Sequence, residues 1–150
     1  MNNEEYTDIV INACYGGFSL SEAAILRYAE IKGIPIWIER KEKWNLATYW
    51  TIPPEEREKN ILEDEEWHKA SLEERREYNK WHDEHTISGR DISRTDPALA
   101  QVVKELGNKA DGRCAELVIV TLAKGTKYYI DEYDGYESVV TPEDLNWEIA

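Results

Sequence analysis

The feature that most constrains the fold is a run of β-branched and apolar residues, Asp8–Cys14, with few polar side chains. Such a run is typical of a strand that is buried on both faces. A second run, Ala115–Leu122, predicts another central strand. Strands of this kind need other elements to cover their faces, so the chain is expected to combine strands with packed helices.

Two sequence patterns predict such helices. The glycines of Tyr15–Phe18 end the first strand, and Ser19-Leu-Ser-Glu22 then has the spacing of a capping box. A helix is expected to follow and to end at Gly33, a left-handed C-cap. A second helix is expected to begin at Asp96-Pro97, an N-cap residue with a first-turn proline, and to end at Gly107.

Further strands are predicted around these elements. Residues 34–39 read as a strand that starts near a proline. Residues 127–133 are expected to form a hairpin with the strand at 115–122, and residues 136–140 are expected to pair back after the Asp134-Gly135 turn. The predicted fold class is α/β, with α+β as the alternative: a small mixed sheet of four to five strands with two or three packed helices.

The middle of the chain differs in charge from the rest. Residues 54–85 hold 12 acidic and 6 basic residues, a net charge of −6 out of −13 for the chain, and all three histidines. Helices are predicted at 54–69 and 71–85, the second with a capping box at Ser71-Leu-Glu-Glu74. We therefore expect a single domain over residues 1–150, with residues 42–86 as a variable, mostly helical and acidic insertion.

Composition excludes several classes of function. A net charge of −13 and a pI near 4.7 argue against direct nucleic-acid binding, which needs a surplus of Lys and Arg. The apolar runs are far shorter than a membrane span. The polar, acidic residues 1–8 argue against a secretory signal or transit peptide. Two cysteines make no disulfide framework, so a cytoplasmic protein is expected.

Several stretches resemble one family. Residues 10–21, VINACYGGFSLS, resemble the opening of an uncharacterised small-protein family of tailed phages and large viruses, and residues 94–107, 115–120 and 130–137 (IDEYDGYE) resemble its second half. The resemblance covers residues 8–38 and 87–140. It implies an α/β fold and a viral accessory role in the cytosol of the host cell, without a catalytic assignment. By analogy with other small phage proteins, it implies an action against host defence.

The strongest candidate for a binding site is the turn after the first strand. Glycines before a capped helix let an anion approach main-chain amides, and nearby arginines add charge, while aromatic rings can stack a base. The alternatives are a tight turn whose donors the capping box already uses, and arginines that pair with Asp91, Asp96 and Asp111. The candidate ligand-binding residues are Asn12, Tyr15, Gly16, Gly17, Ser19, Arg90, Arg94, Arg113, Trp44 and Trp50.

Catalysis and metal binding have weaker support. His82 and His85 share a helix face, which would suit two metal ligands. However, the sequence contains no His-Glu-x-x-His motif and no cysteine pair at metal-ligand spacing, and a solvated acidic helix is the alternative. Cys14 precedes the expected helix, but a buried, inert thiol is the alternative. We expect no cofactor and no metal, assign no catalytic residue, and regard a binding protein as favoured over an enzyme.

Three hypotheses for function follow. The first is a phage-type protein that antagonises host antiviral defence by sequestering a phosphate-bearing nucleotide signal without turnover, a role that a homo-oligomer would suit. The second is an acidic inhibitor or nucleic-acid mimic that blocks a host defence nuclease through residues 54–85. The third is a small nucleotide-modifying enzyme. The expected partner is thus a nucleotide-like ligand or a host defence protein, and neither nucleic acid nor a membrane.

Overall fold

The computed structural model describes residues 5–145 and 147–150. Residues 1–4, half of the polar amino-terminal stretch considered above, lie outside the described residues. The chain divides into two compact units, Met1–Lys32 with Gly89–Ala150 (unit 1) and Gly33–Ser88 (unit 2). The segment predicted as a helical insertion falls in unit 2, which begins several residues earlier than expected.

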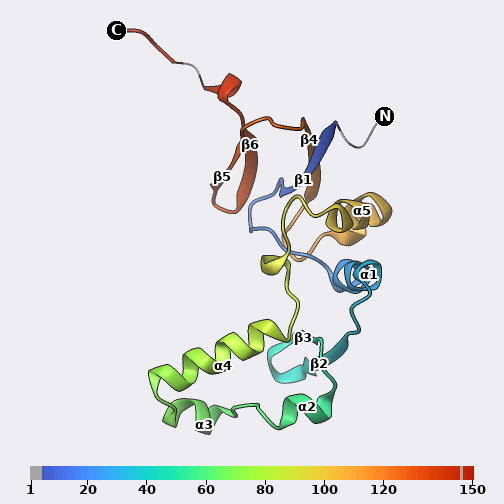
Figure 1. Cartoon of the computed structure of the whole chain (residues 1–150), viewed down its shortest axis with the longest axis vertical. Helices are drawn as coiled ribbons and strands as arrows, with labels where there is room; N and C mark the ends of the chain where they lie inside the picture. The colour runs from blue at the N-terminus through green and yellow to red at the C-terminus, as the bar shows by residue number, and fades with distance from the viewer. Residues whose placement is uncertain (1–4, 146) are drawn as a thin grey trace. The chain divides into compact units, whose positions relative to one another are not determined.

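Unit 1 is built around an antiparallel pair of strands, β1 (Tyr6–Asn12) and β4 (Leu117–Ala123) (Figure 1). Ile9 pairs with Val120, and both Ile9 and its neighbour Val10 are completely buried. Burial of consecutive residues means that both faces of β1 are covered. The two strands predicted from apolar runs are therefore confirmed, each within a few residues of its expected bounds.

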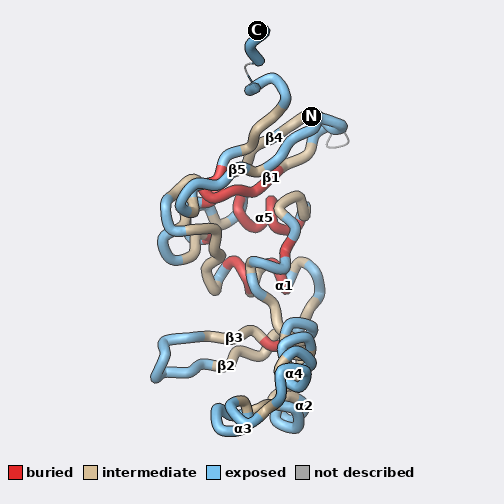
Figure 2. Tube along the Cα trace, turned by 90° about the vertical axis from the view of Figure 1, so that its left-hand side faces the viewer, coloured by how far each residue is buried: buried red, intermediate tan, exposed pale blue. Residues whose placement is uncertain are grey.

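The later of two helices packs against both strands of this pair, the earlier one packs on that helix, and their inner residues form most of the buried core of unit 1 (Figure 2). They are α1 (Glu22–Lys32) and α5 (Pro97–Leu106). Asp96 caps α5 as predicted, accepting a hydrogen bond from the amide of Ala98 at 2.9 Å. The predicted Ser19 capping box is wrong: the amide of Ala24 donates to the hydroxyl of Ser21 at 3.1 Å.

The remaining strands of unit 1 form a separate hairpin of β5 (Tyr129–Tyr133) and β6 (Tyr136–Val140). Asp134 and Gly135 join them with φ angles of 49° and 86°, as a tight two-residue turn requires. The predicted pairing of residues 127–133 with the strand at 115–122 is wrong, because β4 pairs with β1. Across the described residues, six strands form three two-stranded antiparallel sheets, where the sequence predicted one mixed sheet.

Unit 2 contains a second hairpin followed by three helices. Strands β2 (Trp37–Lys41) and β3 (Leu46–Trp50) pair around a short 3₁₀ turn, and Asn45 adopts a left-handed conformation between them. The sequence predicted a mostly helical segment over 42–86, with one helix over 54–69. The structure instead shows strand β3 and two short helices, α2 (Pro54–Glu58) and α3 (Asp64–Lys69).

The longest helix of unit 2, α4 (Leu72–Glu84), begins as predicted, with the amide of Glu74 donating to the Ser71 hydroxyl at 3.1 Å. Its inner face packs against Trp50, which is 1% exposed. The Trp50 ring centroid lies 5.5 Å from that of Trp81 and 5.0 Å from that of His82. An aromatic cluster therefore forms the core of unit 2, in place of the aliphatic core of unit 1.

The described residues form a mixed α+β fold, which is the alternative that the sequence left open beside α/β. No helix in the described part of the chain is long and apolar enough to cross a lipid bilayer.

Candidate functional site

The stretches that carry the family resemblance meet at one place in unit 1. We define the motif junction as residues 12–18, Arg94 and the Asp134–Glu137 segment of the β5–β6 hairpin. In the sequence these three parts are separated by dozens of residues, and the fold joins them by ion pairs, ring contacts and main-chain hydrogen bonds. The motif junction is therefore the first place to look for a binding site built from all three stretches.

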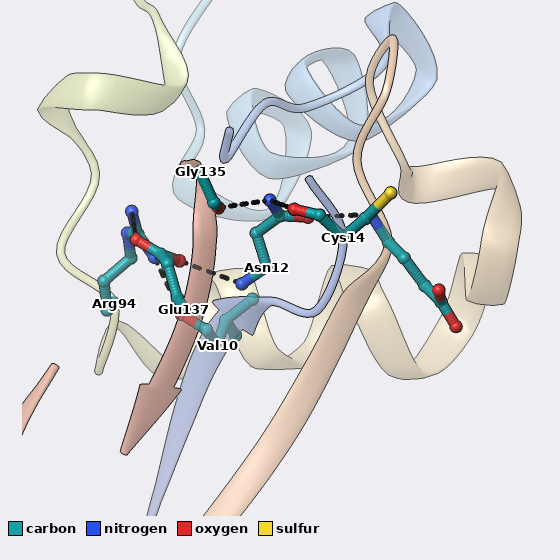
Figure 3. Close-up of polar contacts among 7 residues, drawn as sticks. Val10, Asn12, Cys14, Arg94, Gly135 and Glu137 are labelled. Carbon is teal, nitrogen blue, oxygen red and sulfur yellow. Dashed lines mark hydrogen bonds and ion pairs between the residues drawn. The ribbon is translucent and has the colours of Figure 1, made fainter. Parts of the chain in front are cut away.

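An ion pair between Arg94 and Glu137 lies at the centre of the junction (Figure 3). The two terminal nitrogens of Arg94 donate to the two carboxylate oxygens of Glu137 at 2.6 and 2.9 Å. Glu137 is only 8% exposed, and the guanidinium carbon lies 3.5 Å from the ring centroid of Phe18. The edge of the Arg94 guanidinium therefore pairs with a carboxylate, and its flat face stacks on an aromatic ring. Both are strong modes of arginine binding.

Asn12 connects this ion pair to the hairpin turn. Its main-chain amide donates to Glu137 at 2.9 Å, and its side-chain amide donates to the carbonyls of Cys14 and Gly135 at 2.7 and 2.8 Å. Its side-chain oxygen accepts from the amide of Glu116 at 2.8 Å. Asn12 is completely buried, so these bonds make it a structural residue and leave it no free donor for a ligand.

The Gly16-Gly17 turn packs against the Asp134-Gly135 turn of the hairpin. Gly16 has φ 130° and donates its amide to the carbonyl of Asp134 at 3.3 Å. A Cβ atom on Gly135 would lie 2.8 Å from the Gly16 nitrogen. The two turns approach so closely because neither carries a side chain at the contact. The amide of Gly16, proposed above to hold an anion, is thus bound by the protein itself.

The other predicted residues of the anion site are placed as follows. Ser19 donates its hydroxyl to the carbonyl of Arg113 at 3.2 Å, and the side chains of Arg90 and Arg113 are exposed. Neither arginine makes an ion pair with a described residue. Arg94 pairs with Glu137 and not with its sequence neighbours Asp91 or Asp96, which corrects that alternative.

The two candidate tryptophans belong to unit 2. Trp50 lies in the aromatic core with its indole nitrogen 3.4 Å from a Glu39 carboxylate oxygen, and its ring has no exposed face on which a base could stack. Trp44 is 62% exposed, with the Lys43 ammonium 5.2 Å from its ring. It keeps an open ring face.

Unit 2 presents a surface that the sequence only partly predicted. All aspartates and glutamates within residues 54–85 are exposed, and together we call them the acidic helical surface. They are Glu55, Glu56, Glu58, Glu63, Asp64, Glu65, Glu66, Glu73, Glu74, Glu77, Asp83 and Glu84. No ion pair with a lysine or arginine is formed by any of these residues, all of which the structure describes.

Two of the six basic residues in this segment point inward. The Arg57 guanidinium lies 5.7 Å from the Trp50 ring and 3.6 Å from Glu39. Arg75 lies 5.2 Å from the Trp67 ring and donates to the main-chain carbonyls of Trp67 and His68 at 2.9 and 3.1 Å. Both guanidinium groups are bound by residues of unit 2 and do not offset the exposed carboxylates. The exposed surface is therefore more acidic than the composition alone indicates.

The histidines and cysteines show no arrangement that points to chemistry. His82 packs on Trp50, and His85 contacts the Trp81 carbonyl at 2.7 Å. Over residues 5–145 and 147–150, no group of three or more potential metal ligands converges. The thiol of Cys14 lies 3.5 Å from the carbonyl of Tyr15, its neighbour in the chain.

A hollow of about 420 Å³ lies elsewhere in unit 1, between the end of β4 and the carboxyl-terminal 3₁₀ turn. None of the predicted site residues lines it. Its lining residues are Leu122, Thr126, Lys127, Thr141, Pro142 and Glu143.

Sequence reasoning missed Glu137, the residue that binds Arg94, and Phe18, the ring that covers it. Both lie in the stretches quoted for the family resemblance, but nothing local in either stretch indicates a long-range partner. No protein-family model matches the chain, and neither the comparison with curated proteins nor that with solved structures found a match.

Proposed function

We propose that this protein acts by binding, without turnover, and that its acidic helical surface occupies a basic groove on another protein. The observation that carries the proposal is the exposure of all twelve carboxylates of residues 54–85 without a lysine or arginine partner. Carboxylates held on short helices resemble the phosphates of nucleic acid in charge and accessibility. They complement a surface that is built to bind phosphates.

The main objection to this function is the presence of basic residues among the acidic ones. The sequence allows ordinary helix pairs such as Glu65 with Lys69, or Glu73 and Glu77 with Arg76, and pairs of this kind would make an unremarkable solvated surface. None of these pairs is formed among the described residues. The carboxylates are therefore available to an external cation.

The family resemblance implies the nature of the target. A viral accessory protein in the host cytosol meets defence nucleases, whose DNA-binding grooves are lined by Lys and Arg. We infer that such a nuclease, or another nucleic-acid-binding defence complex, is the partner. The protein would compete with nucleic acid for the groove, and the competition would weaken as salt rises.

A pair of charge-matched variants tests this proposal. In the first, Glu65, Glu66, Glu73 and Glu77 are all changed to Gln, and in the second, four exposed carboxylates outside the surface are changed in the same way: Glu5, Glu42, Glu143 and Glu148. Both raise the net charge by the same amount. DNA cleavage by a panel of purified CRISPR and restriction nucleases is then measured with each protein added.

The wild-type protein and the second variant are expected to inhibit at least one nuclease, and the first variant is expected to lose most of this inhibition. An equal loss of inhibition in both variants would show that only net charge matters, and full inhibition by the first variant would show that the acidic helical surface is not the binding surface. No inhibition by the wild-type protein across the panel would reject the proposed class of target.

The nucleotide-sequestration hypothesis has less support from the geometry. The amide of Gly16 and the guanidinium of Arg94 are both bound within the protein, and Trp50 is buried. What remains is the exposed side chains of Tyr15, Arg90 and Arg113 in unit 1 and the exposed ring of Trp44 in unit 2. This hypothesis and that of a nucleotide-modifying enzyme stay predictions.

A further inference from the structure

The outer face of the β5–β6 hairpin exposes three tyrosines. On a two-stranded sheet, alternate residues share a face, and Tyr133 pairs directly with Tyr136 while Asp131 pairs with Ser138. Glu137 lies on the opposite, inner face, where it binds Arg94. The outer face, which we call the tyrosine face, therefore carries Tyr129, Tyr133 and Tyr136, which are 53%, 77% and 41% exposed.

The tyrosine face continues into the motif junction. The ring centroid of Tyr15, also exposed, lies 5.3 Å from that of Tyr136. Large aromatic side chains that remain exposed in a folded monomer are characteristic of binding surfaces, and tyrosine loses little conformational entropy when it is bound. Exposure of four neighbouring tyrosine rings is therefore a feature that folding alone does not explain.

The hairpin is held firmly from its inner face. Glu137 binds Arg94 through two hydrogen bonds, Gly135 accepts from Asn12, and Asp134 accepts from Gly16. These contacts fix both the strand and the turn, so the exposed rings are presented on a preorganised support. Preorganisation lowers the entropic cost of binding.

The charge of the tyrosine face indicates what kind of partner fits. Residues 129–140 contain no lysine or arginine. By the same alternation Asp131 lies on the tyrosine face and Asp134 lies in the turn at its end, whereas Glu132 pairs with Glu137 on the opposite face. Asp131 and Asp134 are exposed and make no ion pair with a described residue. Tyrosine rings attract cations to their faces, and carboxylates bind guanidinium groups through two parallel hydrogen bonds. These two carboxylates also repel phosphate groups, which disfavours a nucleic-acid partner.

We propose that the tyrosine face binds an arginine-bearing segment of a partner protein, with guanidinium groups stacked on Tyr133 and Tyr136 and paired with Asp131 or Asp134. The protein already shows this mode of arginine binding once, since the Arg94 guanidinium is stacked on Phe18 and paired with Glu137. Lysine is a poorer ligand for such a surface, because an ammonium group neither stacks in a plane nor pairs bidentately.

A binding measurement with defined peptides tests the proposal on the full-length protein. The probes are an arginine nonapeptide and a lysine nonapeptide of equal charge, titrated at physiological salt. The test variant combines Tyr133→Ala with Tyr136→Ala. The control is Tyr6→Ala, which removes an exposed tyrosine of similar exposure from β1. Unfolding temperatures of both variants are measured to verify that the hairpin is intact.

The arginine peptide is expected to bind more tightly than the lysine peptide. The test variant should lose about 5-fold or more in affinity for it, because each exposed cation–π contact accounts for about 2–5-fold. Tyr6→Ala should bind normally. Asp134→Asn should also weaken binding, and the left-handed φ of residue 134 accommodates asparagine.

The acidic helical surface also attracts cationic peptides. The variant with its four Glu→Gln substitutions is therefore titrated in parallel. Arginine selectivity that survives this variant and disappears with the tyrosines supports the tyrosine face, whether or not the nuclease proposal is correct. Equal affinity for the two peptides, or loss of binding only in the Gln variant, would overturn the inference.

Discussion

Removing the Arg94 guanidinium is expected to destabilise unit 1, because it leaves the Glu137 carboxylate buried without its counter-charge. Arg94 supplies two of the three hydrogen bonds to this carboxylate, and the Asn12 amide supplies the third. Loss of one partner of a buried ion pair costs about 3–5 kcal/mol. The Arg94 side chain is 25% exposed, so Arg94→Ala should cost about 3 kcal/mol, at the lower end of that range.

Lys104→Ala is the matched control. The Lys104 ammonium lies 2.6 Å from Asp8, the same distance as the shorter Arg94–Glu137 contact, but this lysine is 59% exposed. Exposed ion pairs contribute about 0–1 kcal/mol. Thermal unfolding should show a decrease in Tm of about 6–12 °C for Arg94→Ala and less than about 4 °C for the control.

A second substitution separates charge burial from lost packing. Glu137→Gln keeps an acceptor for the Asn12 amide but removes the negative charge. Added to Arg94→Ala, it should restore part of the lost stability, because no uncompensated carboxylate remains. A cost for Arg94→Ala no greater than that of Lys104→Ala, or a double variant less stable than Arg94→Ala, would show that the buried charge is not what makes Arg94 important.

Three further outcomes are expected. Gly16→Ala should be at least about 1 kcal/mol more destabilising than Gly17→Ala in urea unfolding, because both have positive φ but only at Gly16 does a Cβ meet Cys114, at 2.7 Å. Burial, followed by the hydrogen bond to Asp96, raises the pKa of Tyr28 to about 12 from 10.0. The resulting stabilisation is complete below pH 10 and lost as pH rises toward 12, so Tyr28→Phe should flatten the decline in stability between these values. In a thermal-shift panel of mono-, di- and cyclic nucleotides we expect no increase in Tm, whereas an increase abolished by Arg113→Ala would restore the nucleotide-sequestration hypothesis.

Local patterns predicted most of the secondary structure because the residues that determine it are close in sequence. Asp96-Pro97 and Ser71 begin helices in the structure as they do in the sequence pattern. Gly33 follows α1 with φ 70°. Capping and turn chemistry depend on neighbours within four residues, so one sequence identifies most of them. The exception is α1, which is capped by Ser21 where the sequence pattern predicted Ser19.

Strand pairing was predicted less well because it depends on competition between distant partners. Residues 127–133 follow β4 after a short turn, which favours a hairpin with it, but β4 pairs along its whole length with β1. Asp134-Gly135 then gives β5 a nearer partner in β6. In unit 2, β3 was missed because residues 42–86 were predicted to be mostly helical and Trp44 and Trp50 were interpreted as ligand-binding residues. Trp50 packs into the core, and the sequence does not show which aromatic residues become buried.

The candidate anion site was predicted from features that the structure uses for packing. Two glycines after a strand permit either an approaching phosphate or an approaching loop, and the sequence of the turn alone does not distinguish the two. The deciding residues, Asp134 and Gly135, lie more than a hundred positions away. An arginine near a helix start is equally ambiguous, because its carboxylate partner, Glu137, lies on a distant strand.

Residues of the motif junction differ in whether folding accounts for them. Asn12, Gly16, Arg94 and Glu137 each bind another residue of the junction, so the need to hold two turns and a strand together explains their presence. Tyr133 does not have such partners. Many polar residues could occupy a solvent-exposed position on a two-stranded sheet, with a lower risk of aggregation than an exposed tyrosine. The inward residues of the junction therefore determine how the hairpin is held, and the outward tyrosines are where a function of unit 1 is to be sought.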